Sequence, residues 1–193
     1  MSEIKSSLAD PGPLGLAGFG LTTVVLSLLN AHIVSSHVMG VVLPLALAYG
    51  GFAQLLAGMW EFRKGNTFGA TAFTSYGAFW ISFYFLINNA ASLGTSAGQG
   101  VGVYLLMWGV FTLYMMFGSL YTNRSLFLVF LFLMLTFFLL AIANFSGSTT
   151  VLGGIIGLVT GILALYTSAA GVINTSANKT VLPLGKSPLQ PRN

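Results

Sequence analysis

The chain has 193 residues, of which only 5% are charged, 55% are hydrophobic and 13% are aromatic, and its formal net charge is +4. A water-soluble domain carries about 25% charged residues, so this chain could not cover a soluble globule with solvated side chains. Its seven basic residues are scattered, which excludes a nucleic-acid footprint, and the absence of cysteine excludes a disulfide framework and a thiolate nucleophile.

Six apolar segments fill most of the chain, and each approaches or exceeds the ~20 residues that a helix needs to cross a membrane. Uninterrupted apolar runs predict helices here, because the strands of a membrane barrel alternate apolar and polar residues. We therefore predict an all-α membrane protein with six transmembrane helices in residues 13–174. Residues 1–12 form a cytoplasmic segment, and residues 175–193 form a loosely ordered cytoplasmic tail. The predicted helices cover residues 14–35, 38–60, 68–92, 101–121, 125–145 and 151–173.

The distribution of Lys and Arg predicts the orientation of these helices. With six crossings, all seven basic residues fall on the side of the N-terminus, and the three loops on the other side contain none. Basic loops stay in the cytoplasm, so we expect both termini there, in a multi-pass protein of the plasma or inner membrane. The basic residues are Lys5, Arg63, Lys64, Arg124, Lys179, Lys186 and Arg192.

Small residues on the first and last segments predict close helix contacts. Burying Leu against Leu gains little in lipid, so membrane helices associate through close backbone approach and hydrogen bonds. The sequence leaves open whether these contacts lie within a protomer or between protomers. Pro44, inside the second segment, should distort that helix and free a carbonyl. The glycines are Gly15, Gly18, Gly153, Gly157 and Gly161.

No Asp, Glu, Lys or Arg lies inside a predicted span, so the usual ionisable relay of a membrane pump is missing. Glu61 lies at the cytoplasmic end of the second helix, beside Arg63 and Lys64. We interpret it as a solvated helix-end pair, with a place in an inner vestibule as the functional alternative. That vestibule would also contain Asp10 and Asn66.

Neutral polar residues follow one face of each of the three helices that run outward. On the first helix, Phe19 and Asn30 lie on one face, and Leu133 and Asn144 share the same spacing on the fifth. The asparagines lie about 16 Å outside the bulky residues. These side chains either bond neighbouring helices or line a pore with an apolar neck and an amide-lined outer mouth, and we favour the pore. The predicted substrate-binding residues are Thr22, Thr23, Asn30, Asn89, Thr136 and Asn144.

Several sequence blocks resemble one known family. Residues 10–16, Asp-Pro-Gly-Pro-Leu-Gly-Leu, resemble the Asn-Pro-Ala-Pro-Leu-Gly-Leu signature of the acetate uptake transporter family. Residues 49–54, 64–69, 71–77 and 180–183 match that family too, so the resemblance covers nearly the whole chain. It implies a six-helix protomer, a hexameric ring, and passage of acetate through each protomer, as proton-coupled uptake or as channel-like flow.

The resemblance also implies a hydrophobic constriction and shows one departure. By motif, the constriction falls on Phe19 and Tyr76, and by spacing after Arg124 it falls on Leu133. Asp10 stands where the signature has Asn, so we expect a negative charge at the mouth that weakens the admission of anions. The same segment also has the pattern of a helix start, with Asp10 as the cap followed by prolines.

The expected function is transport of acetate and related small monocarboxylates, including succinate as a larger substrate, with protons as a second transported species. The expected partners are the lipid bilayer and further copies of the chain, and we expect no metal and no cofactor. The alternative is a membrane sensor or assembly scaffold that moves no solute. A membrane enzyme ranks last, because His32 and His37 are five residues apart and do not share a helix face.

Overall fold

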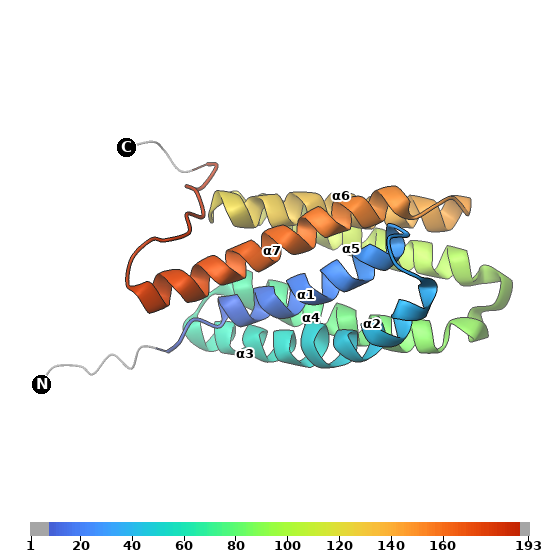
Figure 1. Ribbon diagram of the computed structural model, residues 1–193, viewed down its shortest axis with the longest axis horizontal. Coiled ribbons are helices and arrows are strands. Elements are labelled where there is room, and N and C mark those ends of the chain that lie inside the picture. The colour runs from blue at the N-terminus through green and yellow to red at the C-terminus, as the bar shows by residue number, and fades with distance from the viewer. Residues whose placement is uncertain (1–7, 190–193) are drawn as a thin grey trace, which may run out of the picture.

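The structure is a computed structural model that describes residues 8–189, and all of the regular elements in that range are helices. They form one elongated bundle whose long helices run side by side along its length (Figure 1). In chain order the elements are α1 (Gly12–Asn30), η1 (Ser36–Val38), α2 (Met39–Leu45), η2 (Ala46–Ala53), α3 (Gln54–Lys64), α4 (Thr67–Asn88), η3 (Ala90–Ser96), α5 (Ala97–Ser119), α6 (Arg124–Ser146) and α7 (Val151–Ala177).

Six helices in the described range are long and apolar enough to cross a membrane, which confirms the predicted number. Two of them combine several elements, because η1, α2, η2 and α3 form one crossing and η3 and α5 form another. The crossings are Gly12–Asn30, Ser36–Lys64, Thr67–Asn88, Ala90–Ser119, Arg124–Ser146 and Val151–Ala177.

The second crossing is irregular where the sequence places a proline. Pro44 lies inside α2, and two residues later the backbone widens into the π-helical segment η2 before α3 begins at Gln54. Proline has no amide hydrogen and leaves one carbonyl of the preceding turn without its helical partner. The predicted distortion at Pro44 therefore takes the form of a π-helical stretch, a common site of helix irregularity.

Glycines allow α1 and α7 to pack with their backbones almost in contact. A Cβ on Gly161 would lie 2.9 Å from the carbonyl oxygen of Gly20, and one on Gly154 would collide with the backbone of Ala31. Gly157 leaves room for a side chain of α1, because a Cβ there would collide with the hydroxyl of Ser27. The question left open by the sequence is settled, because these glycines make contacts within the protomer.

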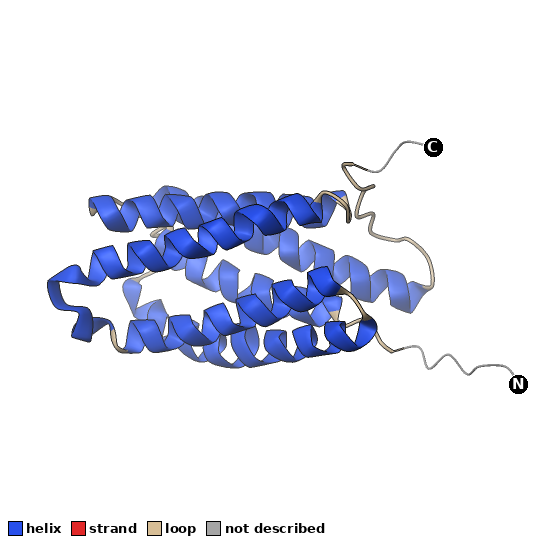
Figure 2. Ribbon diagram, turned by 180° about the vertical axis from the view of Figure 1, so that it is seen from behind, coloured by secondary structure: helices blue, strands red, loops and turns tan. Residues whose placement is uncertain are grey.

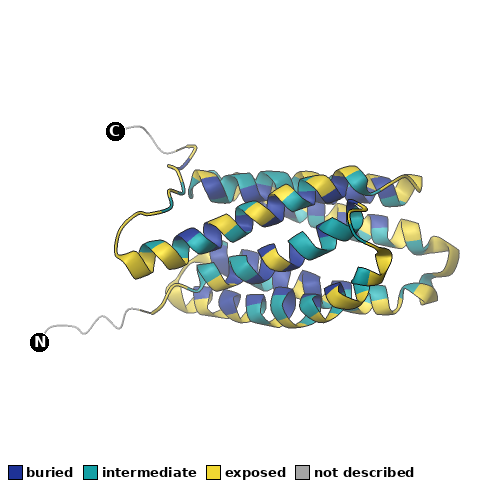
Figure 3. Cartoon of the chain, viewed as in Figure 1, coloured by how far each residue is buried: buried dark blue, intermediate teal, exposed yellow. Residues whose placement is uncertain are grey.

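The outside of the bundle is apolar along its length. Exposed residues run along the helices and are not confined to the connections (Figure 3). They include large apolar side chains such as Phe85, Phe117 and Ile142, which are 55–60% exposed. Such a surface suits a lipid environment, where exposed apolar side chains carry no hydration penalty.

Both ends of the described chain lie at the same end of the bundle, as an even number of crossings requires (Figures 1 and 2). The C-terminal ends of α3 and α7 and the N-terminal end of α6 are also there. Arg63, Lys64 and Arg124 are therefore gathered at the end of the bundle that also holds the termini.

The tail is more ordered than the sequence suggested. The side-chain oxygen of Asn174 accepts hydrogen bonds from the backbone of Val181 (2.7 Å) and Leu182 (2.9 Å). The carbonyl of Leu184 accepts one from the backbone N–H of Ser125 (2.9 Å) at the start of α6. Ser187 donates to the carbonyl of Leu120 (2.7 Å). The prediction of a loose extension was therefore wrong as far as Leu189, because its polar groups are bonded to helix ends.

Candidate functional site: two cavities joined at an apolar neck

Two cavities lie inside the bundle, one nearer each end. The inner cavity, of about 290 Å³, is at the end of the bundle where the described chain begins and ends, and it is lined by Asp10, Glu61 and Lys64 among others. The outer cavity, of about 230 Å³, is lined by residues that include Asn30 and Asn144. Both cavities are mainly apolar, as solute-binding sites usually are.

Phe19 and Leu133 line both cavities, so they lie where the two meet. Tyr76 lines the inner cavity, and its ring centroid is 5.7 Å from that of Phe19. All three side chains are nearly inaccessible to solvent and belong to one buried apolar cluster. We call this place the neck: α1, α4 and α6 each contribute one of its residues.

Packing and one hydrogen bond hold Tyr76 in place at the neck. Its ring lies 5.3 Å from Phe111 in an edge arrangement and 6.1 Å from Phe130, measured between centroids. Its hydroxyl and that of Thr112 are 2.9 Å apart and share a hydrogen bond. A phenol whose polar end is satisfied in this way can present the rest of its ring to a cavity without an unpaired hydroxyl.

Four of the predicted polar residues line the outer cavity: Thr23, Asn30, Thr136 and Asn144. The Thr23 and Thr136 hydroxyls donate to carbonyls of their own helices, at 2.7 and 2.8 Å, and the Asn144 amide does the same at 2.8 Å. Their donor groups are thus partly used within the helix, and the oxygen atoms keep unused acceptor capacity.

Two predicted residues line neither cavity. The Thr22 hydroxyl donates to the carbonyl of Gly18 (2.8 Å), and its side chain packs against Gly50 of η2. Adjacent residues of a helix point about 100° apart, so Thr22 faces η2 while Thr23 faces the outer cavity. Asn89 follows the last residue of α4, where it is exposed and its amide donates to the carbonyl of Phe85 (2.8 Å). Each of these two side chains therefore bonds the backbone of its own helix, so it neither lines a pore nor makes the bond to a neighbouring helix that the sequence analysis gave as the alternative.

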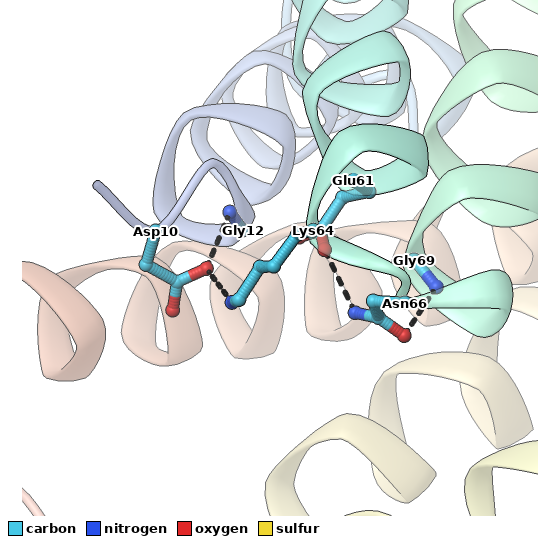
Figure 4. A network of polar contacts seen from close by, with 6 residues as sticks. All are labelled: Asp10, Gly12, Glu61, Lys64, Asn66 and Gly69. Carbon is cyan, nitrogen blue, oxygen red and sulfur yellow. Dashed lines mark hydrogen bonds and ion pairs between the residues drawn. The ribbon is translucent and has the colours of Figure 1, made fainter. Parts of the chain in front are cut away.

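The predicted vestibule residues all line the inner cavity, and Figure 4 shows the polar contacts that they make there. The Lys64 ammonium lies 2.8 Å from a carboxylate oxygen of Asp10, and the same oxygen accepts the backbone N–H of Gly12 (3.1 Å). Asn66 caps α4 by accepting the N–H of Gly69 (3.1 Å), and its amide donates to Glu61 (2.9 Å).

The interpretation of Glu61 as a solvated helix-end pair was wrong. Its side chain is only 1% exposed, because α1 and the start of α4 cover it, and its bonded partner is Asn66. Lys64 pairs with Asp10 instead. The Asp10 charge that we expected to weaken the admission of anions is thus balanced by a cation at contact distance.

Changing Asp10 to Asn should release Lys64 at the mouth of the inner cavity. Both side chains of the ion pair are about half exposed, so stability should change by less than about 1 kcal/mol. The freed positive charge should raise the initial rate of acetate uptake about two- to threefold at low ionic strength and less in high salt. Uptake into proteoliposomes at two salt concentrations measures this.

The double variant Asp10→Asn with Lys64→Gln provides the control, because it removes both charges of the ion pair. We expect its uptake to return to the wild-type rate. A gain that survives the loss of Lys64, or that is equal at both salt concentrations, would contradict the electrostatic explanation.

Gln54 is a polar residue of the inner cavity that the sequence analysis did not select. It is the first residue of α3, it lines the inner cavity and it is 1% exposed. The sequence did contain a signal for it, because Gln54 is the last residue of the block at residues 49–54 that matches the family. Among residues 8–189, no group of three or more His, Asp or Glu side chains gathers in a way that could hold a metal ion.

Six membrane-length helices around two internal cavities define a helical membrane protein that is hollow on both sides of an apolar neck. The chain belongs to the GPR1/FUN34/yaaH family, which its sequence matches over residues 2–188. This membership confirms the family resemblance described above.

Several relatives of this family are transporters by name. The chain is 46% identical over 187 residues to the succinate-acetate/proton symporter SatP of Escherichia coli (strain K12), which covers 95% of this chain and 98% of the relative. It is 38% identical to acetate permease A of Emericella nidulans, over 95% of this chain and 68% of the relative. The solved structure of the bacterial acetate channel SatP matches with a TM-score of 0.86 and 47% identity, over 93% of this chain and all of that one.

Proposed function

We propose that this protein carries acetate and related small monocarboxylates across the cell membrane, through the two cavities and the neck of each protomer. The observation that carries the proposal is that Phe19 and Leu133 line both cavities. The inner and outer cavities therefore meet at two apolar side chains. The substrate class is supported by the names of the relatives, a succinate-acetate/proton symporter and an acetate channel.

The chemistry of the neck favours a small and weakly hydrated solute. Phe19 and Leu133 present only apolar atoms, and the Tyr76 hydroxyl is engaged by Thr112. A hydrated cation would have to shed water there without receiving other ligands. Acetate, with its methyl group, sheds water from one end at little cost. Thr23, Asn30, Thr136 and Asn144 are proposed to receive its polar end on the outer side.

The orientation follows from charge. Because basic loops stay in the cytoplasm, and Arg63, Lys64 and Arg124 lie at the end of the bundle where the described chain begins and ends, the inner cavity is proposed to open to the cytoplasm. The vestibule of Asp10, Glu61 and Asn66 then faces the cytoplasm, and the outer cavity faces the opposite side of the plasma or inner membrane.

The assembly is proposed to be a homo-oligomer, a hexameric ring as the family resemblance implies. The glycines of α1 and α7 are used inside the protomer, so a ring would have to be held by the exposed apolar faces of other helices. Native mass spectrometry of the detergent-solubilised protein would count the copies.

Uptake of radiolabelled acetate by proteoliposomes tests the proposed function. The experiment is best done near pH 8, where little of the acid is protonated and leakage through the lipid is low. We expect uptake well above that of protein-free liposomes, saturable by unlabelled acetate. Flux equal to that of empty liposomes, together with measurable acetate binding, would instead support a membrane sensor.

A further inference from the structure

The segment that follows α7 crosses the inner end of the bundle and is bonded at both of its ends. We call residues 179–189 the strap. Figure 1 shows that it runs from the end of α7 to the start of α6. Near α7, the side chain of Asn174 makes three hydrogen bonds to the strap backbone, of 2.7–2.9 Å. At the far end, the backbone N–H of Leu189 donates to the carbonyl of Leu120 (3.3 Å). The strap therefore joins α7 to the connection between α5 and α6.

Leu184, near the middle of the strap, is held in place by backbone contacts on both of its sides. The carbonyl of the preceding residue, Pro183, accepts a hydrogen bond from the Tyr166 hydroxyl of α7 (2.8 Å). The carbonyl of Leu184 itself accepts one from the backbone N–H of Ser125 (2.9 Å). The next residue, Gly185, has a left-handed backbone (φ 73°), which favours glycine, and packs against the first residue of α6. The position of Leu184 is thus fixed between α7 and α6.

Leu184 is the strap residue that lines the inner cavity. It is half-buried, and Asp10 and Lys64, which line the same cavity, are also about half exposed. Residues that line a cavity and also reach solvent lie at its mouth. The two lysines of the strap, Lys179 and Lys186, are exposed and do not line the cavity. The strap therefore presents an apolar side chain to the mouth of the cavity and keeps its charges outside.

We propose that the strap forms one wall of the mouth of the inner cavity, and that the substrate passes the side chain of Leu184 on its way to or from the cytoplasmic side. This inference rests on the proposed function and deepens it, because it adds a residue that controls access to the inner cavity. Asn174 and Tyr166 are positioning residues in this scheme. They act through the strap and do not touch the substrate.

The width of the mouth depends on the strap in this scheme. A strap that is fixed at both ends holds Leu184 at the mouth, so a group added at that position narrows the passage. A strap released from α7 would let the same group move aside. The alternative is a strap that only stabilises the bundle, in which case a group added at Leu184 would not affect the passage of solute.

A thiol at the mouth tests whether the substrate passes there. The chain has no native cysteine, so Leu184→Cys can be modified selectively with N-ethylmaleimide, which is neutral and crosses the membrane. The reagent therefore reaches the thiol in either orientation of the protein. We expect complete modification to lower acetate uptake by proteoliposomes at least about fivefold. Leu189→Cys is the matched control, because Leu189 is a 53% exposed strap residue that does not line the cavity. Modification of this control should leave uptake unchanged.

Release of the strap tests how Leu184 is positioned. Asn174→Leu removes the three bonds of that side chain to the strap. In this background the thiol of Leu184→Cys should react at least about threefold faster, because the strap opens more often. Its modification should lower uptake less than about twofold, because the added group can move out of the mouth. Asn88→Leu, the same change at an exposed position near the other end of the bundle, should alter neither result.

Tyr166→Phe provides a milder release, which keeps the test decisive if Asn174→Leu does not fold. It removes only the hydroxyl that donates to the carbonyl of Pro183. We expect it to change the rate of thiol modification and the loss of uptake in the same directions, by smaller factors. A strap that only stabilises the bundle would lower the melting temperatures of these variants without changing the effect of modification on uptake.

The outcomes separate this inference from the proposed function. Full acetate uptake by Leu184→Cys after complete modification, measured by mass spectrometry, would overturn the placement of Leu184 on the solute path. A loss of uptake that is equally large with the intact strap and in both released variants would contradict the positioning role of Asn174 and Tyr166. An absence of acetate uptake by the wild-type protein would remove the proposed function instead.

Discussion

The Phe19→Ala variant is expected to transport succinate at least about tenfold faster, relative to acetate, than the wild-type protein does. Phe19 lines both cavities and is 4% exposed, so removal of its ring joins the cavities through a wider passage. A change of this size corresponds to about 1.4 kcal/mol of discrimination, which is within the range that one side chain contributes in an apolar pocket. Competition between labelled acetate and unlabelled succinate in proteoliposomes measures the ratio.

Leu133→Ala should act in the same direction, because Leu133 is the other side chain shared by both cavities. Phe85→Ala is the matched control, since Phe85 is a 55% exposed phenylalanine of α4 and should leave selectivity unchanged. Buried substitutions of this kind also destabilise proteins by about 2–5 kcal/mol, so melting temperatures must be recorded beside the fluxes. Unchanged selectivity in both folded neck variants would remove Phe19 and Leu133 from the transport path.

A single methyl group on Gly154 should destabilise the protein severely. A Cβ at this position would collide with the backbone of Ala31 at the end of α1. A side chain could change its rotamer to relieve such a collision, but backbone atoms cannot. Overpacking of this kind costs about 1–3 kcal/mol. We expect Gly154→Ala to lower the melting temperature of the solubilised protein and the yield of its folded form.

Gly40→Ala is the matched control for this substitution. No atom would lie within 4 Å of a Cβ on Gly40, the second residue of α2. Alanine should be neutral there or more stable by up to about 1 kcal/mol, because it favours the helix. Equal melting temperatures for the two alanine variants would show that the packing of α1 against α7 is not the tight contact described here.

Much of the fold could be predicted from the sequence, because length, apolar content and charge act locally. A run of about 20 apolar residues forms a helix in lipid, because a helix satisfies its backbone hydrogen bonds within the segment. The number of crossings could therefore be predicted correctly. The boundaries were less accurate, since the first helix ends at Asn30 and not near residue 35. His32 takes a left-handed backbone (φ 57°) there, which nothing in its apolar surroundings indicates.

The polar residues of the site were predicted less completely, for two physical reasons. Helical spacing predicts which residues lie on the same face of a helix, but it does not predict how far along or around that helix the cavity extends. Thr22 and Asn89 were therefore grouped with residues that line the outer cavity. Gln54 was not selected because polar faces were followed only along the three helices that run outward, and Gln54 lies on the second crossing, directly after η2. An extra residue in a helical turn rotates everything after it by about 100°, so the regular period does not carry through that segment.

The bonded pairs between distant parts of the chain could not be predicted, although the sequence analysis had placed Asp10 and Glu61 in one vestibule. Asp10 and Lys64 are 54 residues apart and meet only because α1 and α3 pack side by side. The sequence placed Lys64 beside Glu61, its neighbour in the chain, but the side chain of Lys64 turns toward Asp10 instead. The burial of Glu61 likewise follows from tertiary packing.

Cysteine accessibility at the neck tests the central claim most directly, and the chain has no native cysteine to interfere. Leu133→Cys places a thiol in the neck, and Ile142→Cys places one on the exposed face of the same helix, where the native side chain is 60% exposed. Treatment with a small anionic thiosulfonate should abolish acetate uptake by the Leu133→Cys variant, and excess acetate should slow that loss. The Ile142→Cys variant should keep its uptake. Full uptake by the Leu133→Cys variant after its thiol has demonstrably been modified would show that acetate does not pass between the two cavities at this place.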